Sequence, residues 1–130
     1  MNEQTPILRI DLASERPAYE QIVSGLRMLL VSGRFQPQDR LPSVRQLAVD
    51  LGVHHNTVAE AYRVLAEEGW LKLNRGRGAV VADRHGPKPT PEAEEKFRRV
   101  LEELVAKAIA EGVPRPTVIR RILAVSRKLA

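Results

Sequence analysis

The fold is decided by the stretch HHNTVAEAYRVLAEEGWLKLNRGRGAVV, residues His54–Val81. Its first half predicts a helix from about His54 to Glu68, because apolar residues recur at intervals of three and four and Gly69 suits a helix end. The β-prone runs WLKL and AVVA follow, joined by NRGRG, whose glycines give the backbone freedom that a hairpin tip requires. The stretch therefore predicts a helix that runs directly into a β-hairpin.

Two further helices precede this stretch. Residues 16–35, RPAYEQIVSGLRMLLVSGRF, carry apolar side chains on one helical face. The next helix begins with SVRQLAVDLG, in which Ser43 and Gln46 have the spacing of a capping box. Only GVHH separates it from the third helix, which predicts a helix-turn-helix with Val53 as the apolar plug of the turn. Residues 7–11, ILRID, alternate in polarity and predict a short strand.

The composition changes after the hairpin. RHGPKPTP is typical of a linker, and it ends in Thr90 and Pro91, which suit the N-cap and first position of another helix. We therefore predict a mainly α protein with a small β-hairpin, a winged helix-turn-helix domain followed by a two-helix dimerisation appendage. We expect the domain in residues 1–83, the linker in 84–91 and the two helices in 92–130.

The two helices of the appendage each carry an apolar stripe. So short a segment has little core of its own, and packing against a second copy would cover both stripes. Homodimerisation is therefore the favoured prediction, while a partner protein or folding back onto the winged helix remain as alternatives. The residues expected at the dimer interface are Phe97, Leu101, Leu104, Ala108, Ile119 and Ile122.

Composition limits the classes of function. The net charge is +5, but residues 1–84 hold 11 Lys and Arg against 10 Asp and Glu, whereas residues 85–130 hold 10 against 6. Local clusters, rather than net charge, must therefore attract a polyanion such as double-stranded DNA. There is no cysteine, which excludes disulfides and thiolate metal sites. Without an export signal or a long apolar run, we expect a cytoplasmic protein with no membrane partner.

The polar start of the third helix predicts DNA recognition. A helix that enters the major groove needs one anchored apolar face and a free polar N-terminal end. His55 and Asn56 point away from the apolar stripe, and these side chains are able to bond guanine and adenine edges. Arg75 and Arg77 flank a glycine at the predicted hairpin tip and suit the minor groove or its phosphates. Arg45, near the start of the second helix, extends this positive rim.

Residues 16–81 resemble the winged-helix domain of the GntR family of bacterial transcriptional regulators. The elements YEQI, LPSVRQLA, NTVAEAY, EEGWL and GRG occur in the order and spacing of that family. The short two-helix tail resembles the small YtrA-type subfamily, in which this segment mediates dimerisation. The resemblance implies a homodimeric repressor of nearby genes that binds a palindromic operator. It implies DNA contacts at Ser43, Arg45, His54, His55, Asn56, Thr57, Arg75, Gly76 and Arg77.

Two positions depart from the family pattern. Gln38 stands where the family usually has glycine in a PGD turn, which predicts a little turn strain. His54 stands where Ser, Thr or Asn commonly caps the recognition helix, which makes the capping of that helix questionable.

Other classes of function are less well supported. A winged helix that serves as a protein-interaction or assembly module, without a specific operator, is the main alternative. No nucleophile, base and orienting group have the spacing of a catalytic site, so we expect no enzyme activity and no cofactor. Adjacent histidines do not present two ligands to one ion, so we expect no metal site. The sequence leaves open whether a small-molecule effector exists and whether the protein represses or activates.

Overall fold

A computed structural model describes residues 7–74, 78–83 and 89–129 of the chain. The chain divides into two compact units, residues 1–84 and 85–130, which are described separately. Most of the predicted linker lies outside the described residues, so the domain boundaries stay a prediction.

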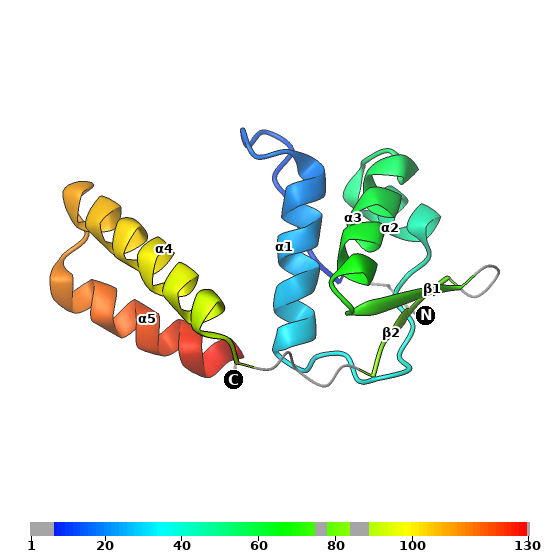
Figure 1. Ribbon diagram of the computed structural model, residues 1–130. Helices are drawn as coiled ribbons and strands as arrows, with labels where there is room; N and C mark the ends of the chain where they lie inside the picture. The colour runs from blue at the N-terminus through cyan, green and yellow to red at the C-terminus, as the bar shows by residue number, and fades with distance from the viewer. Residues whose placement is uncertain (1–6, 75–77, 84–88, 130) are drawn as a thin grey trace. The chain divides into compact units, whose positions relative to one another are not determined.

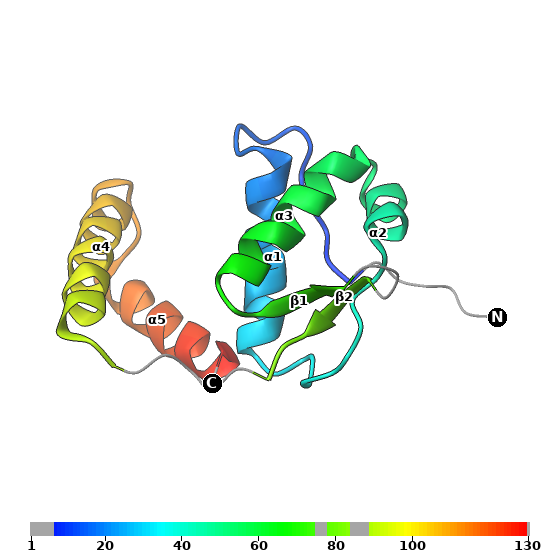
Figure 2. The ribbon, with the colours of Figure 1, turned by 45° about the vertical axis from the view of Figure 1, so that its right-hand side comes forward.

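The first unit is a winged helix-turn-helix, as predicted. Its elements are α1 (Ala18–Val31), α2 (Val44–Leu51), α3 (His55–Glu67), β1 (Leu71–Asn74) and β2 (Gly78–Val81). The central element is α3, which packs against α1, α2 and β1. Figures 1 and 2 show α1 beside α3, α2 against the start of α3, and the hairpin following the end of α3.

One hydrophobic core holds this unit together. The helical periodicity seen in the sequence supplies most of it, because each helix buries its apolar stripe. The fully buried side chains with the largest volumes are Tyr62, Ile22, Leu26, Leu47, Leu65 and Val58. At the edge of the core, Arg27 of α1 donates to both carboxylate oxygens of Glu68, over 3.0 and 2.7 Å, and so ties α1 to the end of α3.

The hairpin is joined by a third segment that the sequence did not reveal. β1 and β2 are antiparallel, with Leu71 opposite Val81. Arg40 forms a bridge to Val80 on the free edge of β2. Around it, the Leu41 N–H donates to the Ala79 carbonyl over 3.0 Å and the Val81 N–H donates to the Asp39 carbonyl over 2.8 Å. The chain that leads into α2 is therefore anchored on the hairpin.

The predicted strand at residues 7–11 is wrong. This segment has no strand, although Leu8 is buried as the alternation suggests. The Leu8 side chain packs on α1 at Gly25, where an added Cβ would lie 3.5 Å from Leu8 Cδ1. The Gln21 side-chain amide accepts from the Asp11 N–H over 2.7 Å and donates to the Asp11 carbonyl over 2.8 Å. Residues 7–11, which were expected to pair as a strand, thus pack on α1 instead, and a side chain of α1 accepts and donates the hydrogen bonds of the Asp11 backbone.

The second unit consists of α4 (Pro91–Ala110) and α5 (Arg115–Leu129), which pack against each other. α4 begins at Pro91, the first helical position predicted from the sequence. The Thr90 hydroxyl caps it by accepting from the Ala93 N–H over 3.1 Å, as expected from the sequence. Between residues 89 and 129, no side chain is buried. Among all described residues, no helix is both long and apolar enough to cross a membrane.

An open apolar groove runs between the two helices. Five of the six residues predicted for dimerisation line it: Phe97, Leu101, Leu104, Ala108 and Ile122. The sixth, Ile119, is not part of this lining but is 61% exposed. Within the second unit, the two helices therefore leave large apolar side chains exposed, as predicted.

Candidate nucleic-acid interface

The turn between α2 and α3 sets the geometry of the candidate interface. Gly52 ends α2 with φ of +72°, a left-handed conformation that glycine adopts without steric cost. Val53 follows, is half-buried against the core, and donates its N–H to the Ala48 carbonyl over 3.0 Å. The predicted role of Val53 as the plug of the turn is therefore confirmed, and α3 begins two residues later.

His54 caps α3, so the doubt about this position is resolved. Its backbone is extended, with φ of −70° and ψ of 144°, and its Nδ1 accepts from the Asn56 N–H over 3.1 Å. A histidine is not a usual capping residue, but Nδ1 has the same role here as the oxygen of a serine or asparagine cap. Because Nδ1 accepts a hydrogen bond, the neutral ring carries its proton on Nε2.

The two histidines at the start of α3 are stacked. Their ring centroids lie 4.2 Å apart with an interplanar angle of 29°. Both side chains and that of Asn56 are exposed. Thr57 is half-buried, and its N–H donates to the His54 carbonyl over 3.0 Å. Two backbone-donated hydrogen bonds and one ring contact therefore hold the polar end of α3.

Ser43 caps α2 but does not form the predicted capping box. Its Oγ accepts from the Gln46 N–H over 3.0 Å. In the other half of such a box, the Gln46 side chain would return to the backbone of Ser43. It donates instead to Asp50 Oδ1 over 2.8 Å, one turn further along α2. Ser43 is exposed at the helix start, as expected for a residue that could meet a phosphate.

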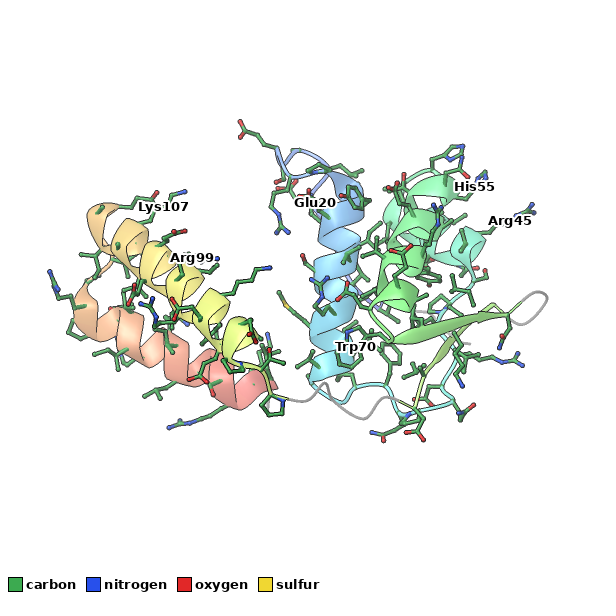
Figure 3. The ribbon with its side chains drawn as sticks, viewed as in Figure 1. Glu20, Arg45, His55, Trp70, Arg99 and Lys107 are labelled. Atoms are coloured by element: carbon green, nitrogen blue, oxygen red, sulfur yellow. The ribbon has the colours of Figure 1, made fainter. Side chains whose placement is uncertain are left out.

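The structure brings Arg45 together with the histidines. Arg45 is exposed on α2, and it lines one hollow with His54 and His55 at the junction of α2 and α3. Figure 3 shows Arg45 and His55 projecting outward on the same side of the unit. The guanidinium of Arg45 and the imidazole rings of His54 and His55, which follow it by nine and ten residues in sequence, thus form one exposed polar surface.

The predicted wing residues lie outside the described part of the chain. Arg75, Gly76 and Arg77 join β1 to β2, and the residues that flank them, Asn74 and Gly78, are paired across the hairpin. The role of these three residues stays a prediction.

Val49 was not among the residues predicted for this surface, but it is an exposed residue of α2 that lines the same hollow. The signal was present, because position 49 falls outside the apolar stripe that Leu47, Ala48 and Leu51 bury. A valine at such a position does not contribute to the packing of the core.

The family described as bacterial regulatory proteins of the gntR family matches residues 18–81. The HTH-type transcriptional repressor YtrA of Bacillus subtilis is 37% identical over 107 residues, which make up 82% of this chain and 82% of YtrA. This chain belongs to the GntR family. The resemblance drawn from the sequence is thereby confirmed, and the match with YtrA extends beyond the winged helix into the second unit.

Solved structures of GntR-type proteins share the fold. YtrA from Sulfolobus acidocaldarius, a GntR-family transcription factor, is 31% identical with a TM-score of 0.55, and the match covers 93% of this chain and 97% of that one. The DNA-binding domain of AraR, solved in complex with operator ORX1, is 25% identical with a TM-score of 0.53. That match covers 58% of this chain and 96% of the AraR domain.

Membership of the GntR family confirms the predicted class of function, a DNA-binding transcriptional regulator. The proteins that this chain matches are regulators rather than enzymes, in agreement with the sequence. The roles of individual residues at the interface rest on the geometry above and on the family resemblance.

Proposed function

We propose that this chain is a homodimeric transcriptional repressor that binds a palindromic operator in the cytoplasm. The observation that carries the proposal is the exposed polar surface formed by Arg45, His54 and His55 at the junction of α2 and α3. Two similarities support it: YtrA of Bacillus subtilis is named a repressor, and the AraR domain was solved on operator DNA.

The recognition helix has the two faces that a DNA-reading helix needs. Its inner face is anchored, because Val58, Ala61 and Leu65 are fully buried. Its N-terminal end is free, with His55 and Asn56 exposed. We assign base contacts to these two residues, since an asparagine amide pairs with adenine in the major groove and an imidazole N–H donates to guanine acceptors.

Arg45 and the wing are assigned to positioning. A guanidinium on α2 beside the recognition helix suits a phosphate, and phosphate contacts fix the register of a protein on DNA without reading sequence. Arg75 and Arg77 take the same role at the adjacent groove. Ser43 and the backbone N–H groups at the starts of both helices add hydrogen-bond donors for phosphates.

The second unit supplies the dimer. Phe97 is 66% exposed and Leu104 62% exposed on α4, and the groove between α4 and α5 needs a cover that removes these side chains from water. The corresponding helices of a second copy offer a surface of the same chemistry, as a two-fold symmetric interface requires. Two recognition helices related by this two-fold axis would then read a palindromic site. A small-molecule effector in the same groove is a weaker candidate, because the groove offers few polar groups to orient one.

The test is selection of bound sequences from a random DNA pool by the full chain at near-physiological salt. We expect one palindrome to be enriched, and we expect an Arg45→Ala, Arg75→Ala variant to lose it. The control variant, Arg99→Ala with Lys107→Ala, removes the same charge from α4 and should select the same palindrome. No enrichment by the wild type would favour a protein-interaction module instead, whereas equal enrichment by both variants would contradict the positioning roles assigned to Arg45 and Arg75.

The dimer is tested by sedimentation of the full chain. Leu104→Glu places an acid in the groove and should yield monomers, whereas Lys107→Glu on an exposed part of the same helix should leave dimers. A dimeric Leu104→Glu variant would contradict the assigned interface.

A further inference from the structure

Val49 is an apolar side chain with no place in the core. It is 77% exposed, a larger fraction than any other large hydrophobic side chain in the described residues. Its neighbours Leu47, Ala48 and Leu51 are buried and account for the packing of α2. A single exposed valine is ordinary on a protein surface, so its location decides whether it has a role.

Its location is the candidate DNA-binding surface. Val49 follows Arg45 by four residues, which places both side chains on one face of α2. Both also line the hollow at the start of α3, together with His55. Arg45 and His55 project on the same side of the unit (Figure 3). DNA that meets both Arg45 and His55 would therefore meet Val49 as well.

The chemistry of the major groove offers one partner for an isopropyl group. Valine neither donates nor accepts hydrogen bonds, so it gains nothing from phosphates, amino groups or carbonyls. The groove carries one apolar group, the C5 methyl of thymine, and aliphatic side chains pack on it. Adenine, guanine and cytosine carry no methyl group at that edge, so such a contact distinguishes thymine from the other bases.

We propose that Val49 is a specificity-determining residue that packs on the C5 methyl of one thymine in each half-site. The proposal rests on the proposed function, because it requires an operator. From the usual transfer free energy of a hydrocarbon group, burial of one methyl group raises the affinity by about fourfold for each contact.

The test uses deoxyuridine, which is thymine without that methyl. Operator duplexes from the selection carry deoxyuridine in place of thymine at one position of both half-sites at a time, and each is titrated with the full chain. We expect one position to weaken binding by about fourfold per half-site. The Val49→Ala variant should bind the unmodified operator about as weakly as the wild type binds the duplex with deoxyuridine at the sensitive position. Deoxyuridine at that position should lower the affinity of the Val49→Ala variant little further.

The matched control is Val31→Ala, the same change at a valine that is 43% exposed on α1. This variant should keep the wild-type response to deoxyuridine, and thermal denaturation should show that both variants fold. The inference is overturned if the wild type tolerates deoxyuridine everywhere, or if Val49→Ala keeps the wild-type sensitivity. If an operator is found, either result leaves the proposed function intact. A selection that yields no operator overturns the proposed function and this inference together.

Discussion

Replacing Gln38 with glycine should stabilise the winged helix. The Asp39 N–H donates to the Gln36 carbonyl over 3.0 Å, Pro37 occupies the second position of this turn, and Gln38 occupies the third with φ of +76°. This is the pattern of a type II turn, whose third position requires positive φ and strongly favours glycine. The sequence predicted strain at this departure from the family pattern, and the conformation of Gln38 agrees with it.

The expected gain is the difference between two effects. An L-residue in the left-handed region costs about 1–2 kcal/mol, which glycine avoids. Glycine loses about 0.4–1 kcal/mol more than other residues through the entropy of the unfolded chain. Gln38 is exposed and its N–H still bonds the Val81 carbonyl after the change, so packing changes little. At mid-range the difference is about 0.8 kcal/mol, so we expect the free energy of unfolding to rise by about that amount, or roughly 3–6 °C in Tm for a domain of this size.

The assay is urea denaturation followed by tryptophan fluorescence. The chain has a single tryptophan, Trp70, which packs against the core of the first unit and therefore reports on its unfolding. Gln36→Gly is the matched control in the same turn. Gln36 is exposed and does not have positive φ, so this change brings the entropic cost without relief of strain. It also removes the hydrogen bond from the Gln36 side-chain amide to the Gly33 carbonyl (3.2 Å), so it should lower stability. If Gln38→Gly lowers the midpoint as Gln36→Gly does, the strain argument is refuted.

Three further predictions concern stability. His54→Ala should cost about 1 kcal/mol of unfolding free energy through loss of the helix cap, and His54→Ser should restore most of it; equal midpoints for wild type and His54→Ala would contradict the cap. Tyr62→Phe should lower the free energy of unfolding by about 1 kcal/mol, because the Tyr62 hydroxyl donates to the Pro42 carbonyl over 2.7 Å. An unchanged denaturation midpoint for this variant would show that the hydrogen bond contributes nothing to stability. The Arg98 guanidinium beside Glu95 lowers the pKa of that carboxyl, so its contribution to α4 should be present at neutral pH and lost as pH falls through the lowered value. A circular dichroism titration should show less acid sensitivity in Glu95→Gln than in the wild type, and unchanged sensitivity would count against the ion pair.

The helices were predictable because their stripes are local. The buried residues of α3 are Val58, Ala61, Tyr62 and Leu65, which fall on one face of a helix, so the periodicity that predicts the helix also predicts its inner face. The exposure of His55 and Asn56 follows from the same pattern. The short GVHH connection between the second and third helices indicated the turn, with Val53 as its plug.

Pairings between distant segments were not predictable in this way. Residues 38–41 form hydrogen bonds with β2, which lies about forty residues away in sequence. This segment is too short to show the alternation that would predict a strand. Residues 7–11 show alternation but pack on α1, because alternation reports burial without saying whether a strand or a helix covers the chain. The cap by His54 depends on the ring orientation, which residue type alone does not specify.

The bond between Tyr62 and Pro42 gives the two DNA-binding helices a common support. Tyr62 lies in the middle of α3, and Pro42 directly precedes the Ser43 cap of α2, the helix that carries Arg45. Burial raises the pKa of the Tyr62 hydroxyl, so this group stays a donor throughout the physiological range. The recognition helix therefore holds the start of α2 directly, in addition to the turn at Gly52. The two helices are thus held together both at the start of α2 and at the turn that follows it, so they present Arg45 and His55 as a rigid pair. A rigid pair binds DNA with a smaller loss of conformational entropy than two independent side chains on mobile loops.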